Sequence, residues 1–321
     1  MPELVDLRQI DLQQLEPLLA EETAEWDQAL DWDFRQNAAQ IRRFAGPRVL
    51  PGVALLDRGE VAGYGYTVLE HSKGLIGDVY LRPGWREVDS EVRLFKVLLD
   101  ALTGTEGIQR IESQLMLVPP QTIGTLGSSR FVQLFERRLL SREVALPVPS
   151  ANAEVEERYR LTEWHSGALE GLSRLVVWSY EGQVDGQIND QFTTEAGAAT
   201  FLRALLENAG CGEFCRFASF VAADRRTESL AGAILTSLVA ANTAHITQIC
   251  VLPEAQSAGL GRELLRRCLA ALAEHGVHRV TLTVTADNVR ANRIYDTAGF
   301  TELRRFCAIV WNSTARMSHS V

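Results

Sequence analysis

Apolar residues in the second half of the chain recur with two periods, and these predict a mixed order of helices and strands. Stretches with apolar residues three and four apart, which favour helices, lie at 166–180, 194–208, 261–275 and 289–298. Stretches rich in apolar and β-branched residues, which favour strands, lie at 159–164, 214–222, 229–239, 244–251, 279–285 and 301–311. Gly276 and Gly299 follow the last two helical stretches, where glycine commonly ends a helix. The predicted order is β-α-α-β-β-β-α-β-α-β.

The first half of the chain repeats this order. Strands are predicted at 4–10, 53–57, 61–70, 75–81 and 108–116, and helices at 12–26, 36–44, 90–102 and 131–139. When Pro83 is aligned with Pro253, Leu94 falls on Leu264 without a gap. Self-similarity over such a length predicts duplicated domains. The Pro-rich segment Pro147–Ala153 separates the repeats, so we predict domains at 1–150 and 154–321.

Composition and charge narrow the class of protein. Of the 321 residues, 46% are apolar and 23% are charged, which is typical of a globular protein with two cores. The formal net charge of −9 disfavours a nucleic-acid partner. The first residues lack the basic and apolar regions of a signal peptide, and no stretch is long and apolar enough to span a membrane, so we expect a cytoplasmic protein. Five scattered cysteines indicate a reducing compartment, and their spacing gives no metal site.

One turn combines features that suit an anionic ligand. The sequence Gln256-Ser-Ala-Gly-Leu-Gly261 follows a β-branched strand and opens a helix. The first amides of a helix have no partner within the helix and lie at the positive end of its dipole. Glycines allow a phosphate to approach the backbone closely. The turn is therefore predicted to bind a phosphate group.

The repeat shows a second version of this turn with different chemistry. In the alignment of Pro83 with Pro253, Asp89 stands opposite Gly259 and Glu91 opposite Gly261. A carboxylate at a helix N-terminus satisfies the dipole itself and repels phosphate. We expect the first half to keep the scaffold and to have lost the phosphate site.

Three features make the second half resemble the GCN5-related N-acetyltransferase (GNAT) superfamily. They are the strand ending at Val251, the Gln-x-x-Gly-x-Gly turn, and the motif Asn288-x-x-Ala-x-x-x-Tyr295-x-x-x-Gly-Phe300. The resemblance implies an α/β (α+β) fold built as a tandem duplication of the GNAT fold, each copy a mixed, mostly antiparallel sheet flanked by helices. Residues 1–150 would be a degenerate GNAT-like domain that does not bind CoA, and 154–321 the catalytic domain. The tandem arrangement with one working half resembles that of mycothiol synthase and its relatives.

The resemblance implies acetyl-CoA as donor and the amine of a small molecule or peptide as acceptor. The pantetheine arm would pair with the strand at Ile249 and Val251. The turn would hold the pyrophosphate, through Gln256, Ser257, Ala258, Gly259, Leu260, Gly261 and Arg262. Asn288 and Asn292 would contact the CoA arm, although Asn288 also suits a helix N-cap.

The chemistry implied is direct acyl transfer, which needs a base and a proton donor. Tyr295 stands at the family's position for the donor to the thiolate, and the alternative for it is a core tyrosine. Strand alternation puts His245 on one face with Thr247, Ile249 and Val251. His245 falls where some GNAT enzymes carry a catalytic glutamate, and a histidine can act as a base. A plain core or surface histidine, with a water chain as the base, is an equal alternative.

The acceptor pocket is expected beside the first helix pair. The polar connection 180–190 carries Glu181 and Asp185, which suit a cationic acceptor or are simply solvated loop acids. Two other functions stay open. One is acetylation of a cysteinyl sugar in the manner of mycothiol synthase. The other is a non-catalytic acyl-CoA sensor, which the presence of Tyr295 disfavours.

Overall fold

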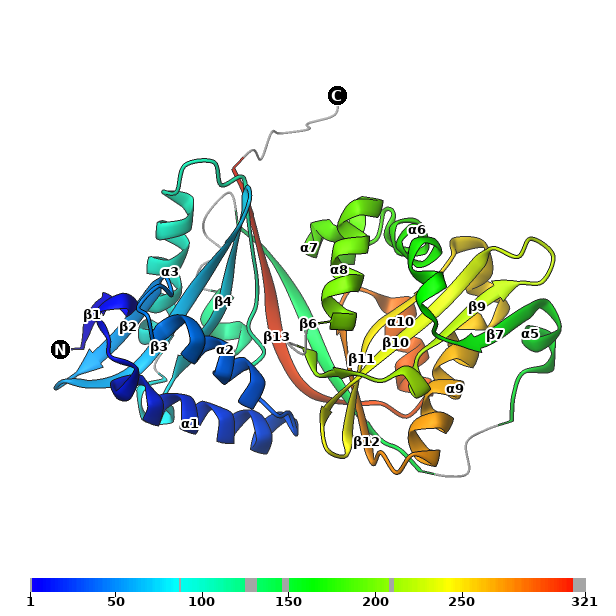
Figure 1. Ribbon diagram of the computed structural model, residues 1–321, viewed down its shortest axis with the longest axis horizontal. Coiled ribbons are helices and arrows are strands. Elements are labelled where there is room, and N and C mark those ends of the chain that lie inside the picture. Colours follow the sequence, from blue (N-terminus) through cyan, green and yellow to red (C-terminus); the bar gives the residue numbers. More distant parts are fainter. Residues whose placement is uncertain (1, 87, 125–131, 146–149, 208–210, 314–321) are drawn as a thin grey trace. The chain divides into compact units, whose positions relative to one another are not determined.

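The computed structural model describes residues 2–86, 88–124, 132–145, 150–207 and 211–313. The chain divides into two compact units (Figure 1). Unit 1 contains Met1–Leu30, Phe34–Arg137 and Arg304–Val321, and unit 2 contains Asp31–Asp33 and Arg138–Leu303. Both units are discontinuous in sequence, so their bounds differ from the predicted domains 1–150 and 154–321. Part of the predicted linker, 147–149, lies outside the described residues.

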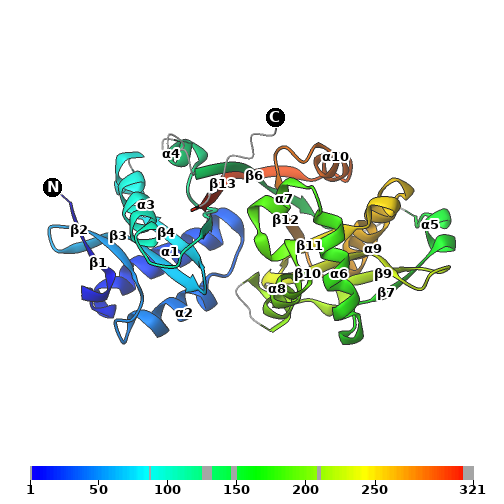
Figure 2. The same cartoon turned by 90° about the horizontal axis from the view of Figure 1, so that it is seen from above.

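Unit 1 is a mixed sheet with helices on both faces. Its strands are β1 (Glu3–Asp6), β2 (Gly52–Asp57), β3 (Glu60–Glu70), β4 (Lys73–Leu81) and β5 (Arg110–Gln114), in that order, followed by β13 (Thr301–Asn312). Its helices are α1 (Leu12–Leu30), α2 (Arg35–Ala45), α3 (Val88–Thr103) and α4 (Pro120–Gly124). Neighbouring strand residues point to opposite faces: Tyr64 contacts Glu22 of α1, whereas Gly65 lies against Leu98 of α3. Figure 2 shows α3 on one face of the sheet and α1 and α2 on the other.

Unit 2 has the same plan. Its strands are β7 (Tyr159–Glu163), β9 (Phe220–Asp224), β10 (Leu230–Ala240), β11 (Thr243–Val251) and β12 (Arg279–Thr285), with β6 (Val132–Glu143) beside β12 and the short β8 (Glu213–Phe214) on β10. Its helices are α5 (Ala153–Arg158), α6 (Leu169–Tyr180), α7 (Val184–Ile188), α8 (Glu195–Glu207), α9 (Leu260–Glu274) and α10 (Val289–Thr297). The short α5 and α7 were not predicted.

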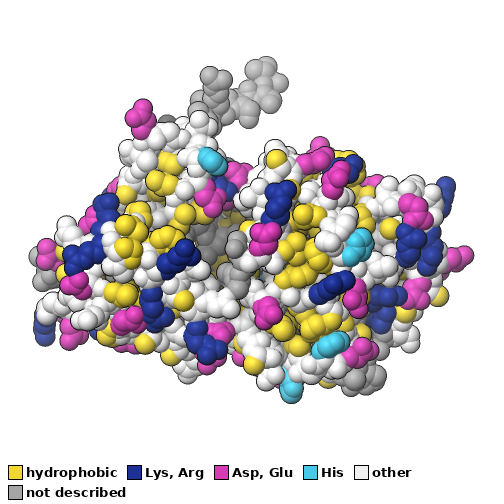
Figure 3. All heavy atoms as spheres, viewed as in Figure 1, with side chains coloured by type: hydrophobic (Ala, Val, Ile, Leu, Met, Phe, Trp, Pro, Cys, Tyr) yellow, Lys and Arg dark blue, Asp and Glu magenta, His cyan; other side chains and the backbone are white. Residues whose placement is uncertain are grey.

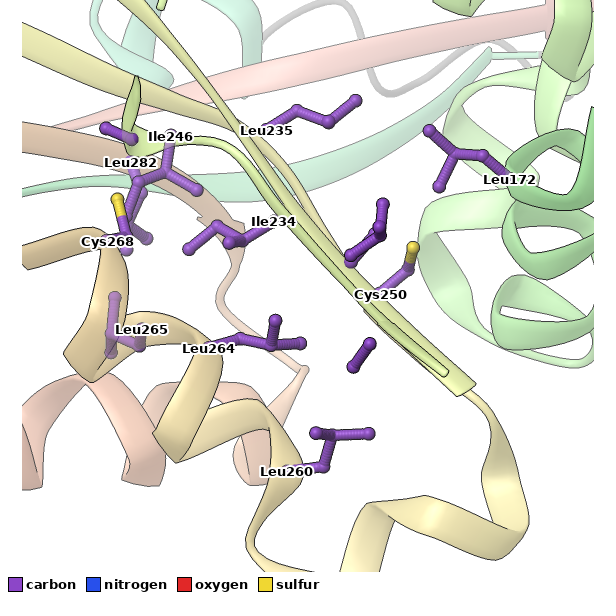
Figure 4. Packing of buried hydrophobic residues seen from close by; sticks show 14 of the residues in the cluster. Leu172, Ile234, Leu235, Ile246, Cys250, Leu260, Leu264, Leu265, Cys268 and Leu282 are labelled. Carbon is purple, nitrogen blue, oxygen red and sulfur yellow. The ribbon is translucent and has the colours of Figure 1, made fainter. Parts of the chain in front are cut away.

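The core of unit 2 lies on both faces of its sheet (Figure 4). Leu264 and Cys268 of α9 pack toward Ile234 and Ile246 on one face. On the other face, Cys250 points toward α6. Each fully buried leucine or isoleucine stabilises the fold by about 1.5–3 kcal/mol, so this packing fixes α9 against the sheet.

The strand register confirms the tandem duplication. In unit 1, Lys73–Leu75 of β4 pair in parallel with Arg110–Glu112 of β5. In unit 2, Thr243–Ile246 of β11 pair in parallel with Arg279–Leu282 of β12. These pairings superpose in the alignment of the repeats that the sequence predicts. The two repeats therefore share their pairing as well as their order of elements.

A β-bulge is also repeated. The register between β3 and β4 slips after Asp78, so that Gly77 has no partner. The register between β10 and β11 slips after Gln248, so that Thr247 has none. Gly77 falls on Thr247 in the alignment of the repeats. A bulge inserts one residue and reverses the faces of all residues beyond it, which a simple alternation does not foresee.

The helix predicted at 131–139 is wrong. Residue 131 lies outside the described part, and the following residues form strand β6. Strand β6 aligns with β13 when the repeats are superposed, so each repeat ends in a long strand. The sequence Val132-Gln-Leu-Phe-Glu-Arg-Arg-Leu-Leu140 fits either period, and pairing within the sheet decides the outcome.

The two last strands complete the sheets of the opposite repeats. Ala308–Asn312 of β13 pair antiparallel with Arg110–Gln114 of β5 in unit 1. Arg138–Glu143 of β6 belong to unit 2, beside β12. This exchange of strands explains why the compact units do not follow the boundary between the repeats.

Unit 1 buries a pair of carboxyl groups. Glu22 is fully buried and Asp78 is 8% exposed. The Tyr64 hydroxyl donates to Glu22 Oε2 at 2.6 Å, and Asp78 Oδ1 accepts from the Val79 amide at 2.8 Å. Burial, and then the charge of Asp78, raise the pKa of Glu22 well above its ordinary value. Burial also raises the pKa of Asp78. Both shifts favour the protonated carboxyl groups, so ionising the two side by side is disfavoured.

We expect Glu22→Gln to stabilise the protein by an amount that grows as pH rises above about 4.5. Protonated Glu22 stabilises the fold fully below its unfolded pKa, and this contribution is lost as pH rises through the raised folded pKa. Glutamine keeps an acceptor for Tyr64 and stays neutral. The measurement is the thermal midpoint of both proteins from about pH 5 to about pH 9. Asp27→Asn, an exposed change on the same helix, serves as the control. A stability difference that does not grow with pH contradicts this expectation.

Candidate active site

The glycine turn has the local structure of an anion site. A 3₁₀ helix at Pro253–Ala258 leads into Gly259, whose φ of 80° lies in the left-handed region that favours glycine. Gly259 is the N-cap of α9 and forms no side-chain cap hydrogen bond. A Cβ at Gly261 would meet only Val251 Cγ2, at 3.6 Å. The fold therefore does not need glycine at position 261, and the missing side chain leaves room for a ligand at the first turn of α9.

Gln256 closes this turn. Its Nε2 donates to the Val251 carbonyl oxygen at 3.1 Å, and its Oε1 accepts from Arg290. In the first repeat, Arg86 Nε donates to the Leu81 carbonyl oxygen at 2.8 Å, which is the same contact at the aligned positions. This shared contact shows that the first residue of the motif shapes the turn in both repeats.

Glu263, in the first turn of α9, forms ion pairs with two arginines of the same helix. Glu263 Oε1 lies 2.6 Å from Arg266 and 3.3 Å from Arg267, and its Oε2 accepts from the Asn152 amide at 3.3 Å. Burial acts to raise the pKa of Glu263, but the bonds from Arg266 and Asn152 outweigh burial, and the pKa is lowered. The start of α9 therefore keeps its positive character. Arg262 lies beside it and is exposed.

The first repeat carries acids at the matching helix start. Asp89 and Glu91 lie in the first turn of α3, as predicted. Glu91 is 6% exposed and accepts a hydrogen bond from the Thr122 hydroxyl at 2.5 Å. These carboxylates stand where the second repeat has Gly259 and Gly261.

Strands β11 and β12 stop pairing before β11 reaches the turn. Their parallel pairing ends at Ile246 and Leu282, although β11 continues to Val251 and β12 to Thr285. The predicted pantetheine residues, Ile249 and Val251, lie in the part of β11 beyond this pairing. A strand edge that leaves its neighbour offers N–H and C=O groups to an extended ligand.

The prediction that His245 lies on the same face of the strand as Ile249 and Val251 is wrong, because a bulge at Thr247 separates them. Ile246 pairs with Thr236, whose Oγ1 lies 3.3 Å from Cys268 Sγ of α9, so Ile246 faces α9. His245 therefore faces the opposite side, that of α6. Beyond the bulge, Gln248 also faces α6, since its Nε2 donates to the Tyr180 hydroxyl at 3.0 Å.

Val251 faces α9, since a Cβ on Gly261 would lie 3.6 Å from Val251 Cγ2. Ile249 faces the same side, because it pairs with Ile234, which packs toward α9. His245 thus shares a face with Gln248 and not with these two residues. The Gln248–Tyr180 pair was not foreseen, because the sequence shows the polar residues but not the bulge that aligns them.

His245 is 7% exposed, and its Nδ1 lies 2.9 Å from the Thr281 hydroxyl on the neighbouring strand. Thr281 stands directly opposite His245 in the parallel register. A histidine whose second nitrogen is held in this way has a fixed ring orientation.

Tyr295 lies in α10 and is 6% exposed. Its ring packs edge-on against Phe300, with centroids 5.9 Å apart. Asn288 caps this helix, since its Oδ1 accepts from the Ala291 amide at 3.1 Å. Capping fixes the start of α10 and with it the position of Tyr295.

Asn292 is held by the protein itself. Its Nδ2 donates to the carbonyl oxygens of Thr285, Ala286 and Asn288 at 2.8 to 3.1 Å. Its Oδ1 accepts from Arg138 at 2.5 Å. These contacts join α10 to the end of β12.

The two predicted acceptor residues lie in different settings. Asp185 of α7 accepts from the Thr285 hydroxyl at 2.8 Å and from Asn288 Nδ2 at 3.4 Å. It therefore lies against the N-terminus of α10. Glu181 follows the end of α6 and is exposed. The structure brings Asp185, and not Glu181, to the helix that carries Tyr295.

Residues 187–300 match the model of the Acetyltransferase (GNAT) family. This match lies within the second half of the chain, which therefore contains a GNAT-type domain. The resemblance seen in the sequence is thereby confirmed, and the protein is an acetyltransferase enzyme. The match covers β11, the glycine turn and α10, and so contains every predicted site residue of the GNAT domain except Glu181 and Asp185.

Curated relatives of this chain include a mycothiol acetyltransferase of Thermobispora bispora. It is 26% identical over 289 residues, which cover 88% of this chain and 90% of the relative. A mycothiol acetyltransferase of Beutenbergia cavernae is 43% identical over 74 residues, or 22% of this chain and 25% of the relative.

Solved structures agree on the fold. A GNAT protein from Sphaerobacter thermophilus has a TM-score of 0.64 at 14% identity, covering 86% of this chain and 85% of that one. A tandem GNAT protein from the clavulanic acid biosynthesis pathway, solved without acetyl-CoA, has a TM-score of 0.63 at 16% identity, covering 98% and 99%. These likenesses extend to the first repeat, and they confirm the duplicated GNAT fold.

The described residues give two further findings on partners. None of their helices has both the length and the apolar character that crossing a membrane requires. They also contain no cluster of three or more metal-binding side chains.

On the face shown in Figure 3, basic and acidic side chains are interspersed over both halves.

We expect Gly261→Glu to lower the affinity for CoA at least about tenfold, because it places a carboxylate at the start of α9 as Glu91 does in the first repeat. The measurement is calorimetric titration with CoA. Gly84→Glu is the matched control, since a Cβ there meets no atom within 4 Å. Wild-type affinity in a folded Gly261→Glu protein contradicts the assignment of the turn.

Proposed function

We propose that the protein transfers the acetyl group of acetyl-CoA directly to a primary amine of a small molecule or peptide, and that the second repeat alone performs the reaction. One observation carries this proposal. The parallel pairing of β11 and β12 stops at Ile246, and the glycine turn follows at the end of the same strand. An extended thioester arm and its anionic end thus have adjacent places to bind.

The donor would lie along β11. Its pantetheine arm would pair with the backbone at Ile249 and Val251, and its pyrophosphate would lie on the amides from Ser257 to Arg262. Gln256 would act by shaping the turn rather than by touching the ligand, as its bond to the Val251 carbonyl indicates. Asn288 and Asn292 would act by fixing the start of α10.

The chemistry would use two groups of the GNAT domain. His245 would take a proton from the acceptor ammonium, and the free amine would attack the thioester carbonyl carbon. The C–S bond then breaks, and Tyr295 would give its proton to the leaving thiolate. The attacking nitrogen would lose its surplus proton to the Tyr295 phenolate, which leaves a neutral amide and restores the tyrosine. A tyrosine suits this step because its ordinary pKa, about 10, is close to that of a thiol.

The acceptor would enter near α7. Asp185 supports this because it holds a carboxylate against the N-terminus of α10, the helix of Tyr295. Glu181 would act farther out, where an exposed acid can attract a cationic acceptor. The acceptor amine is therefore proposed to be cationic before it binds.

A second candidate is the amine of a cysteinyl sugar. It is favoured by the names of the two curated relatives, both mycothiol acetyltransferases, of which one aligns with 88% of the chain. Both candidates use the same donor site and the same two groups, and they differ only in the acceptor.

The test is release of free thiol from acetyl-CoA in the presence of amines, aminosugars, a cysteinyl glycoside and peptides. One acceptor class is expected to give steady turnover. Binding of CoA without thiol release from any amine would contradict the proposed reaction.

In this assay we expect Tyr295→Phe to lower turnover by about 10²-fold or more with little change in acetyl-CoA affinity, because the lost hydroxyl acts only on the leaving group. Tyr159→Phe, a buried change on the far edge strand β7, is the matched control. Wild-type turnover in Tyr295→Phe would remove the donor role.

A further inference from the structure

A segment of the first half of the sequence belongs to unit 2. Residues Asp31–Asp33 connect α1 and α2, yet they pack with unit 2. The Asp33 amide donates to the Val239 carbonyl oxygen at 2.7 Å. Asp31 accepts from the Thr243 hydroxyl, and its Oδ2 lies 3.4 Å from Arg279. The connection is thus attached to β10, β11 and β12.

The backbone of this segment is constrained as well. Asp31 has a φ of 53°, in the left-handed region that non-glycine residues seldom adopt. Such a conformation persists where surrounding contacts hold it. The contacts of Asp31 and Asp33 therefore fix the residue between them.

That residue is Trp32, which is 5% exposed. Its ring lies against His245, with centroids 5.0 Å apart and planes inclined by 54°. The contact places an aromatic wall on the ring that the proposed function uses as the base.

The contacts of His245 favour one tautomer. The Thr281 hydroxyl donates to the Ala244 carbonyl oxygen at 3.3 Å, which leaves the Thr281 oxygen as an acceptor toward Nδ1 of His245 at 2.9 Å. In that arrangement Nδ1 carries the proton and Nε2 is the basic nitrogen. Thr281 therefore holds the ring through Nδ1, and the indole restricts the tilt of the ring.

We infer that Trp32 is a positioning residue for His245, supplied to the catalytic GNAT domain by the first repeat. The inference rests on the proposed function, in which His245 removes the acceptor proton. A ring aimed by Thr281 and Trp32 presents Nε2 in one direction, and the indole keeps water from part of its surface. Asp31, one of the two aspartates that flank Trp32 in the chain, pairs with Arg279.

The experiment compares kcat and KM of Trp32→Ala, Trp32→Phe and Trp178→Ala, with acetyl-CoA and the acceptor found in the thiol-release assay. We expect Trp32→Ala to lower kcat at least about tenfold with the KM for acetyl-CoA unchanged. Trp32→Phe keeps an aromatic wall and should restore most of the rate. Trp178, which is 50% exposed, is the matched control and should have no effect.

A double-mutant cycle with His245→Ala separates positioning from a structural role. If Trp32 acts through His245, Trp32→Ala causes no further loss in the His245→Ala background. A loss of the same size in both backgrounds overturns the inference. Asp31→Asn, which leaves both rings in place, should show the same non-additivity with a smaller effect. If the Trp32→Ala protein does not fold, Asp31→Asn takes its place in the cycle. A loss of turnover by Asp31→Asn that is equally large with and without His245 also overturns the inference.

The result for His245→Ala alone tests the proposed base. Wild-type turnover of that variant removes the base role, and the inference fails with it. A slow His245→Ala together with a fully active Trp32→Ala overturns only the inference. A slow His245→Ala with a slow, non-additive Trp32→Ala supports both.

Discussion

The end of parallel pairing between β11 and β12 is the constraint on which the rest of the site depends. Four residue pairs hold the strands together, and beyond Ile246 they separate. The bulge at Thr247 lies at this point and turns Gln248 toward α6 and Ile249 toward α9. The polar side chains of His245 and Gln248 therefore lie on the α6 face of β11. The last residues of β11, up to Val251, have no partner on β12 and lead directly into the glycine turn.

The first repeat has the same backbone arrangement with different side chains, and we propose that it does not bind CoA. Unit 1 has the same register, the same bulge at Gly77 and the same closing contact, made by Arg86. It differs in the side chains at the start of α3, where Asp89 and Glu91 stand. Both repeats keep the scaffold, and the start of α3 in the first repeat is acidic. This difference accounts for our proposal of one CoA site per chain. The exchange of β6 and β13, together with Trp32, makes each repeat a structural part of the other's unit.

The sequence predicted the duplication, the order of most elements and the glycine turn, because these depend on local patterns and on the constant offset between the repeats. The sequence-based predictions were wrong where residues distant in the chain determine the secondary structure or the direction of a side chain. Residues 132–139 have an ambiguous period and became a strand through pairing. The facing of His245 depended on a bulge that period-two alternation does not contain. Trp32 gave no signal, since its contact with His245 joins residues far apart in the chain.

We propose that the chain binds one CoA, in its second repeat. Calorimetric titration of the full-length protein with CoA measures this directly as a stoichiometry. We expect one CoA per chain. A value of two would show that Asp89 and Glu91 do not prevent binding in the first repeat, and the assignment of a single site would then be wrong.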